Sequence, residues 1–532
     1  MSVYTISEIV SKPTQRERDR TAVRYGEQSL TFGELEGRAE RLAAGLSAAG
    51  FQQGDRCCVL MHNRLEWFEL FFALARLGGV LVPVNHLLTP HEIKYIVEDS
   101  GATWFVAEEQ LWERAEGVRE LLASDGDAGD LRYVAIGGVR PAGGERFGAI
   151  GDTRADTTPY ERLLAPAPLA VRPDVGADDL FLLQYTSGTT GFPKGAEHTH
   201  STVMWNAISQ RQHFMLDETA VYLCLPALSW VAGFHSLCLE TLWSGGTAVV
   251  NPTDEPFSAE RFCDLVERHG ATHVALVPTV MARILALEGI ERRDLSSLRV
   301  AIAGGAAVPV HLMEEMGERL PGVTVLQVYG MSEFPSLVTL LEPQDVVAKM
   351  GSAGKANCVS QVRVVDAEDR DLPAGEVGEI LTRSPATMIG YHGLPDATAA
   401  TLRGGWLHTG DLGHLDGDGY LFISGRSKDL IISGGLNVYP VEVEQVLDRH
   451  PAVIESAVVG VPDPSWGEVV KAVVVLDADG STSEQELHDH LAGQVARYKL
   501  PKLWELRVQP PLPRTASGKL QKFKLLDRAG AR

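Results

Sequence analysis

Residues 185–200, with the sequence YTSGTTGFPKGAEHTH, hold a dense set of potential phosphate ligands. Hydroxyl side chains, glycines and a lysine occupy most of this stretch: Thr186, Ser187, Gly188, Thr189, Thr190, Gly191, Lys194 and Gly195. The apolar run 180–183 before them predicts a buried strand. A strand that opens into such a segment lets several backbone N–H groups converge on one anion, and the hydroxyls add donors. The segment predicts a phosphate-binding loop, with a polar surface turn as the alternative. It is not the common P-loop, because Lys194 precedes a glycine.

Five further segments carry residues that suit a nucleotide. They are Gly304-Gly305-Ala306-Ala307, Tyr329-Gly330-Met331-Ser332-Glu333, the sequence GWLHTGD ending in Asp411, Gly425-Arg426-Ser427-Lys428-Asp429 with the nearby Gly434 and Gly435, and PRTASGK ending in Lys519. A glycine pair at a strand end admits a flat ligand against the backbone, and a carboxylate suits a vicinal diol. Each segment also has an ordinary structural explanation, with Asp411 as a turn acid, Glu333 as an acid in a first helical turn and Lys519 as a solvated lysine.

The first third of the chain alternates helices and strands around these segments. A capping box at Thr31–Glu34 predicts a helix through Leu46, and Thr89-Pro90 predicts the start of another. The other expected elements are strands over 56–60 and 80–84 and a helix over 65–77. This alternation predicts a mostly parallel sheet covered by helices. The Gly-, Asp- and Pro-rich residues 124–178 are expected to form loops and a subdomain seam.

The same alternation resumes from 198 to 330 and then changes. Strands are expected over 220–225, 247–250, 273–277, 299–303 and 323–328, and helices over 258–269, 279–288 and 309–319. Between about 350 and 425, short alternating segments (361–365, 376–382 and 419–424) predict a small antiparallel sheet or barrel. A mixed tail follows Arg426 and contains a second capping box, Ser483–Glu486. We therefore expect a large N-terminal domain over 1–425 and a small C-terminal domain over 426–532.

Composition excludes several classes of protein. The chain has 532 residues and a net charge of −22, so it has no basic surplus with which to bind nucleic acid. The six cysteines are scattered and form no C-x-x-C pattern. No apolar run has the length of a membrane span, and the charged N-terminus lacks the apolar core of a secretory signal. We expect a cytoplasmic protein. Its assembly state stays open, with a homodimer as one possibility.

Taken together and in this order, YTSGTTGFPKG, YGMSE, GWLHTGD, GRSKD and PRTASGK resemble the acyl-adenylate-forming superfamily of acyl-CoA synthetases, peptide-synthetase adenylation domains and firefly luciferase. The similarity extends from about residue 20 to 525. It implies an α/β fold with a large domain of two mostly parallel α/β subdomains plus a small β-barrel-like subdomain, and a small mobile α+β C-terminal domain. It implies an ATP-dependent, Mg²⁺-requiring ligase that forms an acyl-AMP and passes the acyl group to CoA.

The resemblance also implies a role for each matching residue. Thr186 to Lys194 would cradle the β- and γ-phosphates of ATP. Tyr329 would lie against adenine, beside the segment Gly304–Ala307. Ser332 would contact the α-phosphate, Glu333 would hold Mg²⁺, and Asp411 and Arg426 would bind the ribose. Lys519 would bridge the substrate carboxylate and the α-phosphate, Lys428 would be the hinge, and Gly434 and Gly435 would line the thiol tunnel.

Two departures from the superfamily pattern concern the acid. Many relatives have a histidine in the segment that is here Leu225–Gly233, whereas this chain has Trp230 or, depending on the alignment, Ser229 in its place. Trp230 is expected either to gate the acid pocket near Gly233 or to belong to the core. Phe334 after Glu333 replaces the usual small residue and is expected either to narrow the pocket or to point into the core. An apolar wall predicts a fatty or other hydrophobic acid. His198 and His408 are expected to be structural, because a carboxylate substrate is already ionised near pH 7.

Two alternatives to the CoA ligase stay open at this point. One is a ligase that passes the acyl-adenylate to a carrier protein. The other is a catalytically silent nucleotide-binding homologue, which the intact Lys519, Glu333 and Asp411 disfavour.

Overall fold

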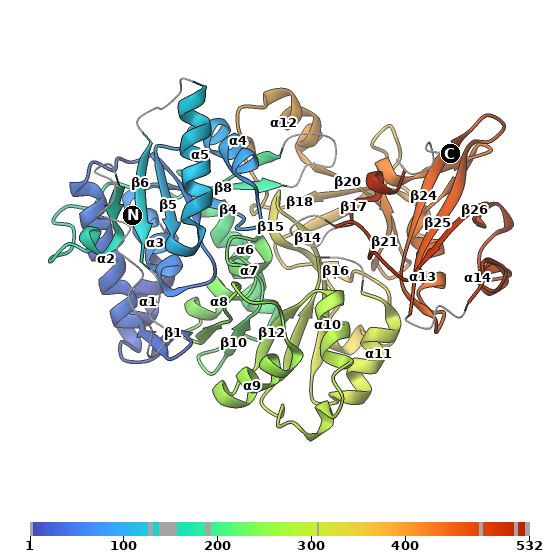
Figure 1. Ribbon diagram of the computed structural model, residues 1–532, viewed down its shortest axis with the longest axis horizontal. Coiled ribbons are helices and arrows are strands. Elements are labelled where there is room, and N and C mark those ends of the chain that lie inside the picture. Colours follow the sequence, from blue (N-terminus) through green and yellow to red (C-terminus); the bar gives the residue numbers. More distant parts are fainter. Residues whose placement is uncertain are drawn as a thin grey trace.

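The computed structural model describes residues 4–125, 131–137, 157–186, 193–305, 308–477, 482–514 and 520–526. In the large N-terminal part, two sheets and three layers of helices alternate, and the C-terminal elements form a separate sheet at one end (Figure 1). Three apolar clusters fill the spaces between these five layers.

A nine-stranded sheet forms one of the two central layers. Its strands, in spatial order, are β16 (Lys355–Ala356), β15 (Phe334–Leu340), β14 (Thr324–Met331), β13 (Val300–Ala303), β12 (His273–Leu276), β10 (Val221–Cys224), β11 (Thr247–Val250), β1 (Thr21–Tyr25) and β2 (Gln28–Thr31). The six strands from β14 to β1 are parallel, and antiparallel strands close both edges. Because parallel strands share one carboxyl edge, the segments after β13 and β14 lie side by side.

An eight-stranded sheet forms the other central layer. Its order is β19 (Gly390–Tyr391), β9 (Lys194–Thr199), β8 (Leu180–Thr186), β4 (Val80–Val84), β3 (Arg56–Leu60), β5 (Trp104–Glu108), β6 (Arg132–Ile136) and β7 (Thr157–Pro159). The strands from β8 to β7 are parallel, while β9 and β19 are antiparallel to their neighbours. Strand β19 comes from far along the chain and extends this sheet beside β9.

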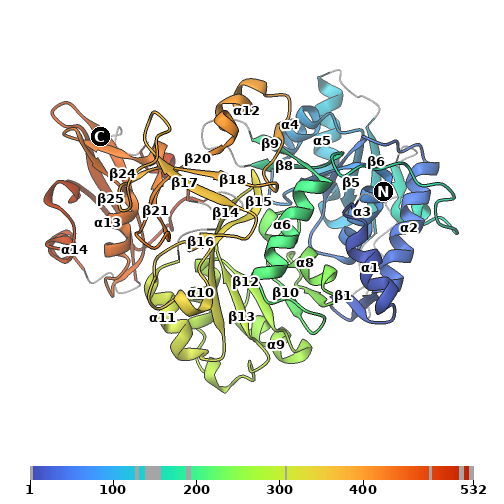
Figure 2. The same ribbon diagram turned by 180° about the vertical axis from the view of Figure 1, so that it is seen from behind.

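Helices cover both faces of both sheets. The layer between the sheets holds α1 (Glu8–Arg16), α2 (Phe32–Ala48), α3 (Leu65–Leu77), α6 (His200–His213), α7 (Val231–Phe234) and α8 (Cys238–Trp243). Figure 2 shows α1, α2, α3, α6 and α8 from behind, and α7 is labelled in Figure 1. The outer layers hold α4 (Pro90–Ser100) and α5 (Trp112–Ser124) on the eight-stranded sheet, and α9 (Ala259–His269), α10 (Pro278–Leu285) and α11 (Val310–Arg319) on the nine-stranded sheet. Twelve of the thirteen residues of α3 are buried, as expected for a helix enclosed on all sides.

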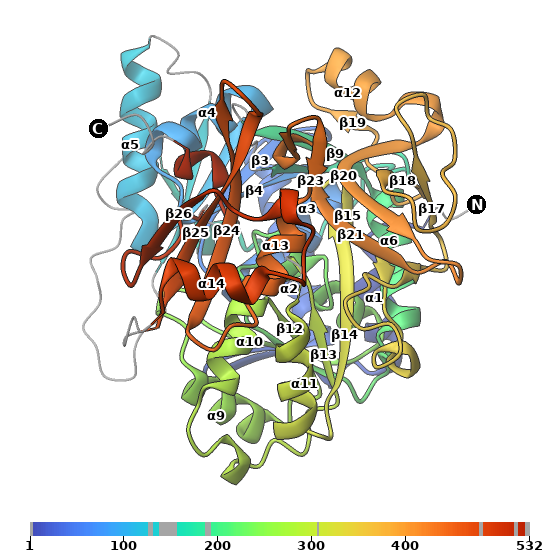
Figure 3. The same cartoon turned by 90° about the vertical axis from the view of Figure 1, so that its right-hand side faces the viewer.

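A four-stranded antiparallel sheet follows and leads into the C-terminal part. Its order is β17 (Gln361–Val365), β18 (Gly378–Arg383), β20 (Leu407–Leu415) and β21 (Leu421–Arg426), with α12 (Pro395–Thr401) beside β19 and β20. The last sheet contains β23 (Leu436–Val438), β22 (Ile431–Ser433), β25 (Gly467–Leu476), β24 (Val453–Asp463) and β26 (Leu503–Arg507), and α13 (Pro440–Leu447) and α14 (Glu484–Leu491) pack against it (Figure 3).

Short 3₁₀ turns connect several of these elements. They are η1 (Glu109–Leu111), η3 (Tyr160–Leu163), η4 (Ile290–Arg292), η5 (Pro343–Asp345), η6 (Arg403–Gly405), η7 (Ser427–Asp429), η8 (Arg497–Lys499) and η9 (Lys522–Leu525).

The predicted fold class and most predicted elements are confirmed. The capping boxes at Thr31, Thr89 and Ser483 all form, each with the backbone N–H and the carboxylate of its third helical residue. The expectation of loops over 124–178 is wrong in part, because β6 and β7 in that range pair with β5 and with each other. The strand expected to end at 328 runs on to Met331, so Tyr329 lies within β14.

Candidate nucleotide-binding site

Three of the predicted nucleotide ligands meet at one carboxylate. Asp411 and Arg426 lie opposite each other in the β20–β21 ladder, and Arg426 Nε is 2.6 Å from Asp411 Oδ1. Tyr329 reaches the same carboxylate from β14, where its Oη donates to Asp411 Oδ2 at 2.6 Å. Burial and then the Asp411 charge raise the pKa of Tyr329 well above its usual value, so the phenol stays a donor. The sequence pattern placed these residues in one site, and the structure brings them into contact.

The backbone around Asp411 is held by a second carboxylate, that of Glu379 in β18. Glu379 Oε1 accepts from the Gly410 N–H at 3.2 Å, and its Oε2 lies 2.9 Å from His408 Nδ1. Gly410 has φ +68°, a conformation that side chains disfavour. His408 is buried and paired with Glu379, which agrees with the structural role predicted for it.

His198 is also structural. Its side chain is fully buried on β9 and its Nε2–H donates to the Ser332 carbonyl at 2.8 Å. Burial lowers its pKa to about 4, so the ring is neutral at physiological pH. This contact joins the eight-stranded sheet to the turn that carries Ser332 and Glu333.

Glycines line the carboxyl edge of the nine-stranded sheet beside Tyr329. A side chain at Gly304 would place its Cβ 2.7 Å from Val328 Cγ2 and 3.1 Å from the Val328 carbonyl oxygen. Gly305 has φ +80°. Gly304 therefore has no room for a side chain, and its backbone packs directly against Val328, the residue before the aromatic ring predicted to lie against adenine. Ala306 of the same segment lies outside the described residues.

The predicted phosphate loop is described at its two ends. Thr186 and Lys194 lie opposite each other where β8 and β9 pair, and Thr186 Oγ1 donates to the Lys194 carbonyl at 3.4 Å. Ser187, Gly188, Thr189, Thr190 and Gly191 lie outside the described residues, as does Lys519. Their predicted roles stay predictions.

Glu333 has a partner that the sequence did not suggest. Tyr391 Oη donates to Glu333 Oε1 at 2.8 Å, and Lys194 Nζ lies 4.9 Å from the centre of the Tyr391 ring. Tyr391 is thus placed between the carboxylate predicted for the metal and the lysine predicted for phosphate. In the sequence it is one of twelve tyrosines, and only the pairing of β19 with β9 gives it this position.

The three residues predicted for the acid pocket, Gly233, Phe334 and Trp230, differ in how deeply they are buried. Gly233 in α7 cannot carry a side chain, because a Cβ there would lie 1.9 Å from the Ala227 carbonyl oxygen. Phe334 is fully buried in a small cluster with Val338 and Ala386. Of the two roles open for Phe334, the structure therefore shows the core position, and its contact with an acid stays a prediction. Trp230 is half-buried at the start of α7.

The hinge and tunnel candidates follow directly after the Asp411–Arg426 pair. Lys428 lies in η7, between the last strand of the four-stranded sheet and the first strand of the C-terminal sheet. Gly434 and Gly435 make the turn between β22 and β23 with φ +59° and +81°. A Cβ at Gly434 would lie 2.7 Å from Trp466 Cε3, so the Trp466 ring fills the space that a side chain at this position would need.

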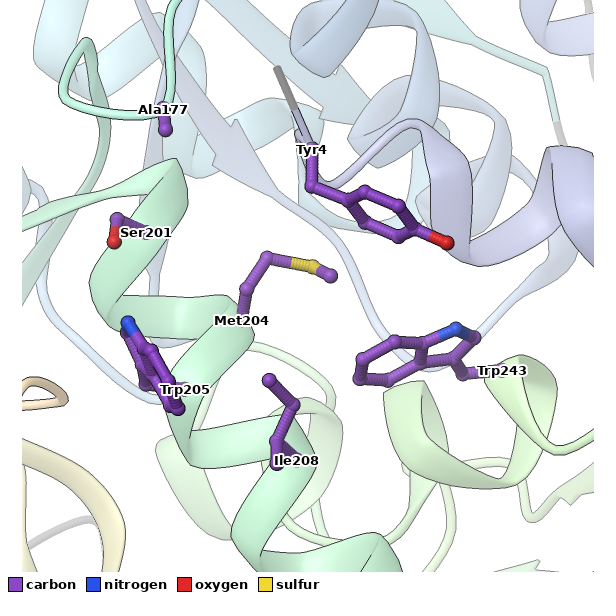
Figure 4. Close-up of a pocket in the computed structure, with 7 residues that line it drawn as sticks. All are labelled: Tyr4, Ala177, Ser201, Met204, Trp205, Ile208 and Trp243. Atoms are coloured by element: carbon purple, nitrogen blue, oxygen red, sulfur yellow. The ribbon is translucent and has the colours of Figure 1, made fainter. Parts of the chain in front are cut away.

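A surface pocket of about 430 Å³ lies elsewhere, on α6, α8 and the N-terminal segment (Figure 4). Its lining is mainly apolar and consists of Tyr4, Ala177, Ser201, Met204, Trp205, Ile208 and Trp243. No predicted nucleotide ligand lines it. Among the described residues, no helix is both long and apolar enough to cross a bilayer, and no group of three potential metal-ligating side chains gathers.

Comparisons with known proteins agree with the geometry of the site. The feruloyl-CoA synthase of an Amycolatopsis species is 40% identical over 98% of this chain and 99% of its own length. The fatty acid–[acyl-carrier-protein] ligase ScoC of Streptomyces coeruleorubidus is 35% identical over 99% of this chain and 96% of its own. The crystal structure of the anthranilate CoA ligase AuaEII in complex with anthranoyl-AMP is 29% identical, with a TM-score of 0.88 over 100% of this chain and 98% of that one.

Two family models match the chain. The AMP-binding enzyme family matches residues 10–392, and the AMP-binding enzyme C-terminal domain matches residues 442–519. The first match contains Tyr329 and Glu333, and the second reaches Lys519. The chain therefore belongs to the AMP-binding enzyme family.

Proposed function

We propose that this enzyme activates a hydrophobic carboxylic acid with ATP and transfers it to CoA. The acid carboxylate attacks the α-phosphorus of ATP, which gives an acyl-AMP and releases pyrophosphate. The CoA thiol then attacks the acyl carbon, which gives a thioester and releases AMP. The observation that carries the proposal is the convergence of Tyr329 and Arg426 on Asp411, beside the glycine pair Gly304-Gly305 at the end of β13. An adenosine moiety fits this arrangement, with its ring against Tyr329 and its diol at Asp411.

Charge explains why the first step needs the remaining residues. A carboxylate must approach a polyphosphate, and two unit charges about 4 Å apart repel by about 4 kcal/mol at an effective dielectric constant near 20. Lys194 at the end of the phosphate loop and Lys519 offset this repulsion, and donors aimed at the developing charge stabilise the transition state.

Glu333 is suited to hold Mg²⁺ together with ATP. Magnesium is usually bound by one or two carboxylates plus substrate phosphates rather than by a cage of protein ligands. A single carboxylate at the end of β14, without a cluster of metal-ligating groups among the described residues, fits that mode. When bound, the ion would neutralise phosphate charge. Glu333 and the loop donors would orient the triphosphate for in-line displacement.

The two half-reactions make different demands on the C-terminal part. We propose that residues 426–532 form a small domain that rotates about Lys428 and first brings Lys519 to the acid and the α-phosphate. After rotation, Gly434 and Gly435 would line the path of the pantetheine arm. Of the two glycines, Gly435 has no atom of the described residues, its chain neighbours aside, within 4 Å of the position of a Cβ, so a slender chain could approach the backbone there.

The acid is proposed to have an apolar body, aryl or alkyl. The segment Val221–Gly233 contains no acidic residue that could pair with a substrate ammonium group, which argues against an α-amino acid. The feruloyl-CoA synthase and the anthranilate CoA ligase act on aromatic acids, as their names say. Aromatic acids therefore belong beside fatty acids in any test.

A carrier protein is the second candidate acceptor, and one finding favours it. The relative ScoC, which matches nearly the full length of this chain, is a ligase for an acyl-carrier protein. The acceptor then changes, but the adenylation step and its residues do not.

An acid-dependent AMP-release assay tests both candidates. The enzyme is incubated with ATP, Mg²⁺ and a panel of short, medium and long fatty acids and of aromatic acids, with either CoA or a phosphopantetheinylated carrier protein. We expect AMP release and thioester formation with at least one hydrophobic acid and CoA. Thioester formed only on the carrier protein would favour the second candidate. Tight ATP binding without turnover of any acid would contradict both.

A further inference from the structure

The short segment from Met388 to His392 joins two parts of the site. Its backbone runs along β9, where Ile389 N donates to the Glu197 carbonyl at 2.9 Å and His392 N donates to the Gly195 carbonyl at 2.8 Å. At its start, Met388 N donates to the Glu333 carbonyl at 2.9 Å. The segment is therefore hydrogen-bonded both to the strand that descends from the phosphate loop and to the residue predicted to hold the metal.

Tyr391 in this segment has a fixed backbone. Its N–H donates to Thr398 Oγ1 in α12 at 2.9 Å, and the Thr398 hydroxyl in turn donates to the Leu394 carbonyl at 2.9 Å. Gly390 before it is closely covered, because a Cβ there would lie 2.9 Å from Thr398 Cγ2. The side chain of Tyr391 packs against an apolar cluster of Ala196, Met388 and Leu407.

The two ends of the Tyr391 side chain make two different contacts. The hydroxyl donates to Glu333 Oε1 at 2.8 Å. The ring face has Lys194 Nζ 4.9 Å from its centre, which is within the range of a cation–π interaction. One side chain thus contacts both groups, the carboxylate through a hydrogen bond and the ammonium through its ring face.

We propose that Tyr391 is a positioning residue that sets the orientation of the Glu333 carboxylate for Mg²⁺ and the place of the Lys194 ammonium for the phosphates of ATP. This role rests on the proposed function, in which these two groups bind MgATP. By occupying one carboxylate oxygen, the hydroxyl limits rotation of Glu333, and an oriented ligand binds a metal with less loss of entropy. The rigid ring supports a long, flexible lysine that would otherwise be disordered in many rotamers.

Two substitutions separate the two contacts. Tyr391→Phe removes the hydroxyl on Glu333 and keeps the ring beneath Lys194, whereas Tyr391→Leu removes both. Binding of α,β-methylene-ATP, whose methylene bridge prevents transfer of the adenylyl group, is measured by calorimetry with Mg²⁺ and with EDTA. The ratio of the two affinities isolates the metal-dependent contribution, and the affinity in EDTA reports on Lys194.

For Tyr391→Phe we expect the gain in affinity on adding Mg²⁺ to fall about tenfold, the loss typical of a hydrogen bond to a charged group. Its affinity in EDTA should stay at the wild-type value. For Tyr391→Leu the affinity in EDTA should also fall, by about threefold for a partly exposed cation–π contact. A wild-type Mg²⁺ gain in Tyr391→Phe would overturn the proposal.

Tyr160→Phe is the matched control. Tyr160 Oη also donates to a carboxylate, Glu69 Oε2, at 2.6 Å, but it lies in the core and touches no predicted site residue. The Tyr160→Phe variant should have a lower Tm and unchanged affinities for α,β-methylene-ATP with Mg²⁺ and with EDTA. If Mg²⁺ raised the affinity of this variant as little as that of Tyr391→Phe, the proposal would also be overturned. The binding experiment needs no acid. If the wild type binds MgATP but turns over no acid, the proposed function fails while the role of Tyr391 is still decided by the two affinities.

Discussion

At Asp411, an isosteric substitution can separate the effect of the carboxylate charge from that of the side chain's shape. Its side chain is 7% exposed and accepts from both Arg426 and Tyr329. Removing one partner of a buried ion pair is costly mainly because it leaves the other charge without compensation. Asp411→Asn keeps the shape of the side chain and removes its charge, so it tests the charge alone.

We expect Asp411→Asn to weaken ATP binding about tenfold or more, since a hydrogen bond to a charged group is lost and Arg426 loses its counter-charge. Binding of α,β-methylene-ATP by calorimetry measures the change. Thioester formation from a prepared acyl-AMP should suffer as well, because the nucleotide stays bound through both steps. Wild-type affinity in this variant would show that Asp411 is a structural acid only.

Lys519→Ala tests the proposed bridging role of the terminal lysine. Loss of one well-placed donor typically reduces the rate by about 10²–10³, and this lysine also offsets the repulsion between two anions. We expect acid-dependent pyrophosphate exchange to disappear while Tm and ATP binding are retained. Near-normal exchange in this variant would remove Lys519 from the first half-reaction.

At the residue scale, the sequence predicted the members of the site better than their contacts. Tyr329, Asp411 and Arg426 could be named because each lies in a distinctive motif. Their convergence on one carboxylate could not, since β14 and β20 belong to different sheets. Tyr391 could not be named at all, because its importance comes only from two neighbours, Glu333 and Lys194, that are distant in the sequence.

At the scale of elements, the residues on both sides of the Lys519 segment are described. Gln521 N donates to the Pro513 carbonyl at 2.8 Å, which brings the two sides together. Glu455 on β24 accepts from Leu512 N at 2.9 Å and from Arg514 Nη2 at 2.5 Å. On the other side, Lys522 Nζ donates to Glu444 at 2.6 Å. Two carboxylates, Glu455 on β24 and Glu444 on α13, thus hold the residues on both sides of this segment.

We expect Glu455→Gln to slow adenylation by on the order of tenfold, because a small displacement of a catalytic group is costly in rate. The amide can still accept from Leu512 N, and a partly exposed ion pair contributes little to stability, so Tm should barely change. Pyrophosphate exchange, thioester formation from prepared acyl-AMP and Tm are compared with wild type. An unchanged exchange rate would show that the Arg514 contact does not position the loop.

Lys428→Pro tests the hinge. Proline restricts φ at this position and the conformation of the residue before it, so a rotation that depends on η7 should be blocked. We expect adenylate formation to continue and thioester formation to fall strongly, measured as separate half-reactions. Equal loss of both would contradict a hinge at this residue.

Local signals predicted elements well and pairing poorly. The helix over 65–77 and the strand over 80–84 have the predicted bounds, because their apolar runs and the glycines between them are local features. Strand β6 was missed since its five residues lie between loop-like segments and gain their structure from pairing with β5. Strands β1 and β2 belong to the nine-stranded sheet, whereas β3, β4 and β5, which follow them in the chain, belong to the eight-stranded sheet. This long-range pairing cannot be read from the local sequence.

At the scale of the whole molecule, the five layers bury titratable side chains as well as apolar surface. Glu240 on α8 is 0% exposed between the two central sheets. Burial raises its pKa to about 8 from an ordinary value of 4.5. Between these two pH values the folded protein keeps a proton on Glu240 that the unfolded chain gives up. Stability therefore falls as pH rises through this range, by at most about 1.4 kcal/mol per pH unit.

We expect Glu240→Gln to raise Tm above that of the wild type at pH 8 and to leave the two nearly equal at pH 5. Thermal unfolding of both proteins from pH 5 to 8 measures this. The two proteins must be compared because buried neutral histidines make stability rise with pH, opposite to the effect of Glu240. Burial lowers the pKa values of four such histidines to about 4 or below: His198, His200, His235 and His273. Parallel curves for the two proteins would mean that Glu240 is ionised in the fold.

Arg426 ends β21, and the crossing into the C-terminal sheet begins with the very next residue. Its guanidinium is also tied to the carboxylate proposed to receive the sugar of the nucleotide. Binding or release of that sugar would therefore act directly on the residue at which the C-terminal part, proposed to rotate, is attached. If that part rotates, release of AMP would be coupled to its return to the starting orientation.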